Sequence, residues 1–90
     1  GPTGAVDRMI AIKPPPGRTA ILLTDIRRAD TDETVFYESV RWDGWTVDQM
    51  KSFWADRAVA SGWMHRWVDG ALVVDNGHGK IIRHRFVAEA

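Results

Sequence analysis

The sequence predicts an α+β domain: a two-layer sandwich in which one helix crosses one face of a mostly antiparallel sheet of four or five strands. Three observations predict it. Two runs rich in β-branched and aromatic residues, 19–28 and 34–42, flank a polar turn. A capped segment with apolar residues at helical spacing, about 46–61, follows them. Short apolar runs separated by turn residues complete the chain. The resulting order is hairpin, helix, hairpin, strand.

The composition indicates a single globular domain over residues 9–90. Gly1-Pro2 resembles the scar of a cleaved tag, so residues 1–8 are expected to be a tag remnant or a disordered N-terminus, and Met9 is a candidate native start. The 90 residues contain twelve Lys+Arg, twelve Asp+Glu and no Cys. The absence of cysteine suits a reducing cytoplasm, which is the expected location. No apolar run is long enough for a transmembrane helix.

The segment Met9–Lys13 is apolar enough for a short strand. Pro14, Pro15, Pro16 and Gly17 end it and predict a stiff connector. Pairing of 19–28 with 34–42 across a five-residue turn places a set of apolar side chains on one face of the sheet. Thr24 and Glu38 share that face with Leu22, Ile26, Phe36, Val40 and Trp42.

The helix has signals at both ends. Thr46 is a good N-cap, Gln49 completes a capping box, and Gly62 provides a left-handed stop. The apolar stripe of this helix predicts that it packs on the sheet. We expect Met50, Phe53, Trp54 and Ala58 to contact Leu22, Ile26, Phe36, Trp67, Leu72, Val74, Ile82 and Phe86.

The C-terminal part reads as a tight hairpin, 63–68 and 71–75, followed by a strand over 81–87. Asp69-Gly70 suits a type I′ turn. A five-residue loop, 76–80, keeps Arg83 and Arg85 out of the core, whereas a four-residue loop would bury both charges. This register places Trp63, His65, Trp67, Leu72, Val74, Ile82, His84 and Phe86 on one face, and Arg66 with Arg83 and Arg85 on the other.

The leading functional hypothesis is a non-catalytic protein–protein binding module, with a homodimer among the candidate assemblies. Five tryptophans are many for the core of so short a chain, and tryptophan and arginine are typical interface residues. The expected contact residues are Trp45, Trp63, Arg66, Arg83 and Arg85. The partner is expected to be a protein, and no membrane contact is expected.

Two alternatives remain. The arginine-lined face of the sheet could hold nucleic acid, although the equal numbers of acidic and basic residues favour this reading less. A small acid–base hydrolase or nuclease could use Glu38 with His65 or His84, since a carboxyl beside an imidazole in an apolar site is the minimum for proton transfer. The spacing of the three histidines fits no metal site, and no cofactor motif is present.

Overall fold

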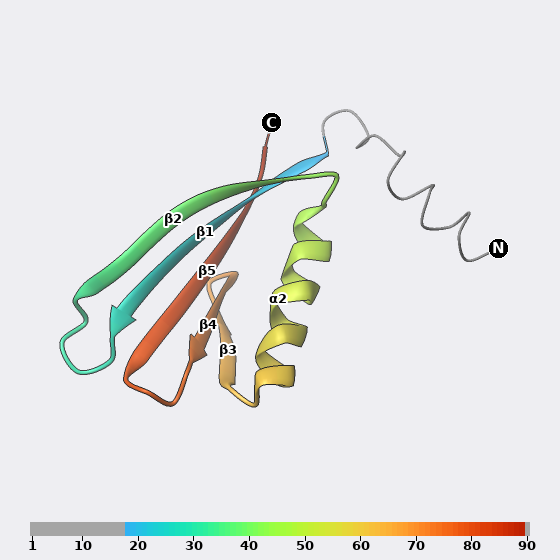
Figure 1. Cartoon of the computed structure of the whole chain (residues 1–90). Helices are drawn as coiled ribbons and strands as arrows, with labels where there is room; N and C mark the ends of the chain where they lie inside the picture. The colour runs from blue at the N-terminus through green and yellow to red at the C-terminus, as the bar shows by residue number, and fades with distance from the viewer. Residues whose placement is uncertain (1–17, 90) are drawn as a thin grey trace, which may run out of the picture.

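A computed structural model describes residues 18–89 of the chain. The predictions for residues 1–8, for the strand Met9–Lys13 and for the proline connector lie outside the described residues. The predicted α+β class is confirmed, and the described residues form five strands and one helix (Figure 1). The elements in chain order are β1 (Thr19–Arg28), β2 (Thr34–Asp43), α2 (Val47–Ser61), β3 (Met64–Val68), β4 (Ala71–Asp75) and β5 (Lys80–Ala88).

The strands form one antiparallel sheet in the order β2-β1-β5-β4-β3, so β2 and β3 are its edges. Thr24 lies opposite Glu38 in β2 and opposite His84 in β5. Val74 lies opposite Ile82, as the five-residue loop requires. The predicted faces are therefore confirmed. We call the face toward α2 the inner face and the opposite one the outer face.

The local signals for the helix and for the tight turn are also confirmed. The Thr46 side chain accepts from the Gln49 backbone N–H at 3.1 Å, and the Gln49 side chain accepts from the Thr46 N–H at 2.9 Å. Gly62 ends the helix with φ 72°. Asp69 and Gly70 have φ values of 50° and 79°, and a type I′ turn requires positive φ at both positions.

The core lies between α2 and the inner face. Met50 of the helix and Leu72 of β4 are fully buried, and Ala20 and Leu22 of β1 pack in the same cluster as Met50. Near the start of the helix, aromatic rings pack edge to face. These rings are Trp42, Trp45, Phe53 and Trp54, with centroids 4.9–5.9 Å apart in the contacting pairs.

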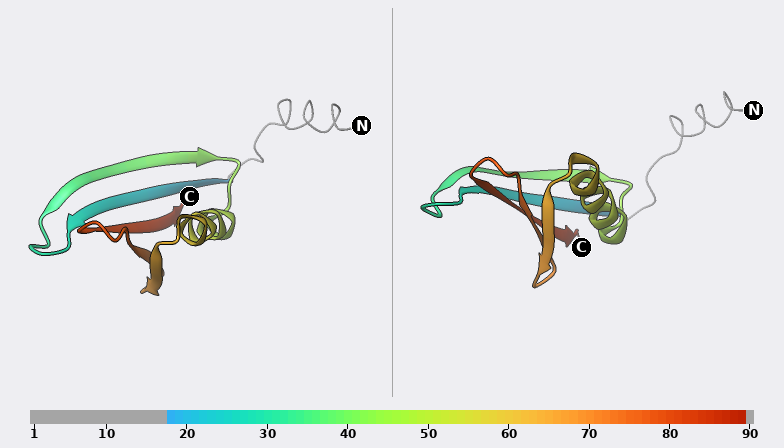
Figure 2. Two further views of the ribbon diagram at one scale, coloured as in Figure 1. Left: turned by 60° about the horizontal axis from the view of Figure 1, so that its bottom comes forward. Right: turned by 90° about the horizontal axis from the view of Figure 1, so that it is seen from below.

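The helix covers the sheet unevenly, which differs from the expectation that Phe36 packs on it. Its backbone lies over β1, β3, β4 and β5, and it contacts β2 through the ring of Trp42 near the end of that strand. Figures 1 and 2 show the long β1–β2 hairpin curving away beyond the helix. Strand twist accumulates across a sheet, so a straight helix cannot follow all five strands. Phe36 consequently stays 45% exposed, and an open space remains between α2 and β2.

Candidate functional site

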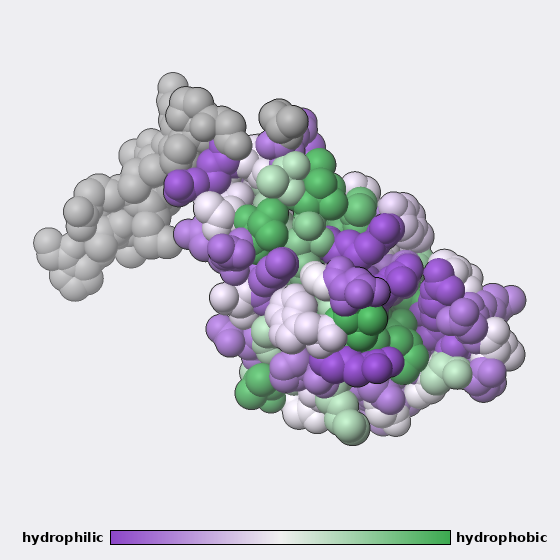
Figure 3. All heavy atoms as spheres, turned by 180° about the vertical axis from the view of Figure 1, so that it is seen from behind, coloured by the Kyte–Doolittle hydropathy of each residue, from purple (hydrophilic) through white to green (hydrophobic). Residues whose placement is uncertain are grey.

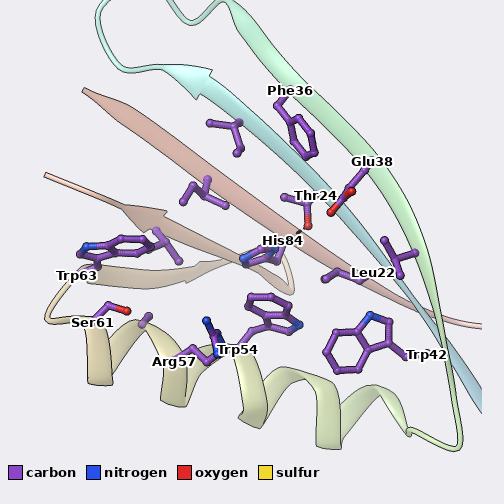
Figure 4. Close-up of a pocket in the computed structure, with 15 residues that line it drawn as sticks. Leu22, Thr24, Phe36, Glu38, Trp42, Trp54, Arg57, Ser61, Trp63 and His84 are labelled. Atoms are coloured by element: carbon purple, nitrogen blue, oxygen red, sulfur yellow. Dashed lines mark hydrogen bonds between the residues drawn. The ribbon is translucent and has the colours of Figure 1, made fainter. Parts of the chain in front are cut away.

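The space between α2 and the β1–β2 hairpin is a groove of ≈ 520 Å³. Pockets for small ligands or partner side chains have volumes of this order. Most of the lining is apolar or aromatic, and Figure 4 shows the labelled side chains converging on the groove from the sheet and from the helix. The lining residues are Leu22, Thr24, Ile26, Phe36, Glu38, Val40, Trp42, Trp54, Arg57, Ala58, Ser61, Trp63, Val74, Ile82 and His84.

The polar residues of the groove floor form a row across three strands. Glu38 in β2, Thr24 in β1 and His84 in β5 occupy directly paired positions on the inner face. Side chains in such cross-strand pairs have Cβ atoms about 4.5–5.5 Å apart. The Thr24 Oγ1 and His84 Nδ1 atoms share a hydrogen bond of 2.9 Å, visible in Figure 4. Thr24 and His84 are both buried, at 6% and 7% exposure.

Burial determines the charge of His84. Desolvation by its surroundings lowers the pKa of the imidazole from 6.5 to about 4. The ring of Trp54 lies against it, with centroids 4.6 Å apart, and contributes to that apolar environment. His84 is therefore neutral at physiological pH, and one of its ring nitrogens is already engaged by Thr24.

The opposite wall comes from α2 and the residue that follows its cap. Arg57 lies over the rings of Phe53 and Trp54, with its guanidinium carbon 5.7 and 5.6 Å from their centroids. Ser61, the last helical residue, and Trp63 close this end of the groove. Trp63 remains 39% exposed. The groove thus offers a charged group and a half-exposed indole on the wall facing the apolar sheet.

The structure places the two tryptophans predicted as contact residues in different settings. Trp63 lines the groove and is accessible. Trp45 packs against Trp42 and Phe53 in the core cluster that contains Met50, and its remaining surface borders a shallow hollow near Asp48. Trp45 therefore serves largely as core, because the turn before the helix points it inward.

The three predicted arginines share the outer face, but they do not form a free basic field. Arg83 donates to the carboxylate of Asp25 at 2.9 Å, and Asp25 is 7% exposed. Arg66 is separated from Arg83 by Val73 of β4, and Arg85 is exposed on β5. The view from behind shows hydrophilic and hydrophobic side chains intermixed (Figure 3). Part of the positive charge is thus already neutralised within the chain.

The residues considered for acid–base chemistry are only partly brought together. Glu38 and His84 share the groove floor, on either side of Thr24. His65 lies opposite Val74 on the edge strand β3 and is exposed, so it is outside this site. Among residues 18–89, Glu38 forms no side-chain hydrogen bond. The row contains a carboxylate and an imidazole, which can transfer protons. It lacks the hydrogen bond between them that usually activates such a pair for catalysis.

Sequence reasoning placed the polar residues on the correct face but missed the groove. Thr24 was recognised there, yet its bond to His84 depends on β1 lying beside β5, a pairing of residues 60 positions apart. The available signal was an apolar inner face longer than one 15-residue helix could cover. Arg57 and Ser61 could have been included by their helical spacing from Trp54 and Ala58.

Within the described residues, no group of three or more His, Cys, Asp or Glu side chains is arranged to hold a metal ion. In the same part of the chain, no helix is long and apolar enough to cross a membrane. Comparison with known protein families finds no matching family model, and comparisons with curated proteins and with solved structures find no significant match.

Proposed function

We propose that this domain is a non-catalytic protein-binding module whose partner inserts apolar side chains into the groove between α2 and β2. The observation that carries the proposal is the groove itself, ≈ 520 Å³ in volume and lined chiefly by apolar and aromatic residues that the helix leaves uncovered. Aromatic side chains in a partly desolvated hollow are typical anchors of protein interfaces.

The exposure of the lining supports a protein partner. Phe36 is 45% exposed, Trp63 39% and Val40 37%, and these residues belong to both walls. The groove is partly open to solvent, and its β2 wall continues into exposed strand. A partner segment can follow such a surface, whereas small-molecule sites bury most of the ligand.

The polar floor supports a role in specificity. Neutral His84, held by Thr24, and the free carboxylate of Glu38 offer hydrogen-bonding groups beside apolar walls. A few placed polar groups in an apolar site fix the orientation of what binds there. Acid–base catalysis has weaker support, because a base with a pKa of about 4 accepts protons poorly at neutral pH.

The nucleic-acid alternative also has weaker support. It requires cations free to contact phosphate, and the Arg83 guanidinium is engaged with the buried Asp25. Most aromatic rings lie on the inner face, away from Arg66, Arg83 and Arg85, and the outer face has Tyr37 as its exposed ring among the described residues. Binding that weakens steeply with salt and is lost in Arg66→Glu/Arg85→Glu would reverse this preference.

A photocrosslinking experiment tests the proposal. A benzophenone amino acid at Ser61, inside the groove, should capture a single protein from a lysate of the source cells. The same probe at Val59, 66% exposed on the same helix but outside the groove, should not. The adduct should be lost in Trp63→Ala and kept in Trp67→Ala. These two tryptophans are 39% and 46% exposed, and only Trp63 lines the groove.

Adducts that are identical at Ser61 and Val59, or that survive Trp63→Ala, would contradict the assignment of the groove. The absence of any adduct at Ser61 would contradict it as well. Circular dichroism of each variant establishes that the fold is intact, so that loss of capture reports on the surface alone.

A further inference from the structure

Within residues 18–89, the edge strand β2 presents unpaired backbone groups in a definite pattern. The Gly44 N–H donates to the Arg18 carbonyl at 2.9 Å, in register with the pairing of Thr19 and Asp43. Hydrogen-bonded and non-bonded pairs alternate along an antiparallel ladder. The even-numbered residues 38, 40 and 42 therefore bond to β1. Tyr37, Ser39 and Arg41 direct their N–H and C=O groups away from the sheet.

The pairing of β1 with β5 supports this assignment. The Glu89 N–H donates to the Thr19 carbonyl at 3.0 Å. Odd-numbered residues of β1 thus face β5, which leaves its even-numbered residues for β2. The two ladders agree on which backbone groups of β2 face outward.

This edge has only part of the usual protection against pairing. β2 carries Glu38, Arg41 and Asp43 and pairs irregularly near Thr34, but it is ten residues long, contains no Pro or Lys, and exposes Val35, Phe36, Tyr37 and Val40. Edge strands that remain single are typically short, charged or interrupted by proline. β3 at the other edge follows that pattern, with five residues and Arg66 at its centre. The chemistry of the β2 edge matches one kind of occupant, another β-strand.

We propose that the occupant is β2 of a second copy of this chain, paired antiparallel about a two-fold axis at Ser39. A two-fold axis perpendicular to the sheet pairs inner-face residues with inner-face residues of the second copy. Because side chains alternate between the two faces along a strand, the axis must then pass through a residue and not between two residues. An axis at Glu38 would set that carboxylate against its own copy, which is unfavourable. An axis at Tyr37 would bring the irregular pairing near Thr34 within three residues of the axis, whereas an axis at Ser39 leaves it at the end of the interface.

The axis at Ser39 aligns complementary side chains. On the outer face, Tyr37 lies opposite Arg41 of the second copy, and the same pair recurs on the other side of the axis. Arginine and an aromatic ring attract one another in such pairs. On the inner face, Phe36 lies opposite Trp42. An axis at Val40 would instead leave Phe36 opposite Gly44, without a side chain to contact.

This interface is independent of what fills the groove, although the two features adjoin. Phe36 and Trp42 both line the groove of their own chain. In the paired arrangement each chain brings its Trp42 beside Phe36 of the other, which extends the apolar wall across the two-fold axis. Failure of the groove proposal would leave the pairing intact, because the groove test changes residues of α2, of β3 and of the link between them, and none of β2.

The first test uses introduced cysteines, since the chain has none. In Ser39→Cys the two thiols would face one another across the axis, with Cα atoms about 5.5 Å apart, within the reach of a disulfide. In Thr34→Cys the thiols would be about 30 Å apart at the strand rise per residue. Oxidation should give a covalent dimer with Ser39→Cys and none with Thr34→Cys. Equal yields from the two variants would refute the register.

The second test is sedimentation of the full chain over a range of concentrations. Ser39→Pro removes an outward N–H and no hydrogen bond to β1, so it should give a folded monomer. Wild type and Ser39→Ala should be dimers. If Ser39→Pro fails to fold by circular dichroism, the Ser39→Cys result decides.

A wild type that is monomeric throughout, or a folded Ser39→Pro that remains dimeric, would overturn the proposal. A monomeric wild type that dimerises once residues 1–17 are deleted would also overturn it, since the edge would then belong to that segment.

Discussion

Replacement of His84 by Gln is expected to remove a specific part of the pH dependence of stability. The buried imidazole has its pKa lowered from 6.5 to about 4 in the folded chain by desolvation. On unfolding it regains its ordinary pKa. Between about pH 4 and pH 6.5 the His84 imidazole is protonated in the unfolded state and neutral in the folded state. Protonation therefore favours unfolding as the pH falls.

The size of the effect follows from the two pKa values. At pH 8 the imidazole is neutral in both states and contributes nothing through ionisation. The loss begins as the pH falls through 6.5 and is complete below about 4. Each pKa unit is worth about 1.4 kcal/mol, so the loss reaches ~2 kcal/mol at pH 5. This value is an upper bound, because water in the groove reaches one side of the site and screens the charge.

Urea unfolding at pH 8, 6.5 and 5 measures the effect. The free-energy difference between wild type and His84→Gln should fall by up to ~2 kcal/mol from pH 8 to pH 5, because only wild type can protonate there on unfolding. His65→Gln is the matched control, since His65 is exposed on β3. A difference between wild type and His84→Gln that stays constant with pH would refute the argument that burial keeps this imidazole neutral.

Three further predictions concern stability, and chemical denaturation followed by circular dichroism checks each of them. Met50→Ala should cost about 2–5 kcal/mol, because Met50 is fully buried, while the same change at Met64, 78% exposed, should cost little. Thr46→Ala should lower stability by ~1 kcal/mol through loss of the capping box, whereas Ser52→Ala on the exposed helix surface should not. Gly70→Ala should cost about 1 kcal/mol through backbone strain at φ 79°, since a Cβ there meets no other atom.

The sequence by itself determined the elements and their faces, because the signals for them are local. Thr46, Gln49 and Gly62 fix the ends of the helix through backbone hydrogen bonds within a few residues. Asp69-Gly70 fixes the turn between β3 and β4 through its positive φ angles. Strand alternation then decides which side chains share a face, and the cost of burying Arg83 and Arg85 selected the register of β5.

Only the tertiary structure decided how those faces meet. The pairing of β1 with β5 joins distant segments and brings Thr24 to His84, and no local pattern encodes that neighbour. The sequence indicated that the helix packs on the sheet, but not that twist would carry the part of β2 around Phe36 away from the helix. The groove, the exposure of Phe36 and the free edge of β2 all follow from that geometry. Local chemistry selects the elements of this protein, whereas the strand order and the accumulated twist decide that the groove and the edge of β2 stay open.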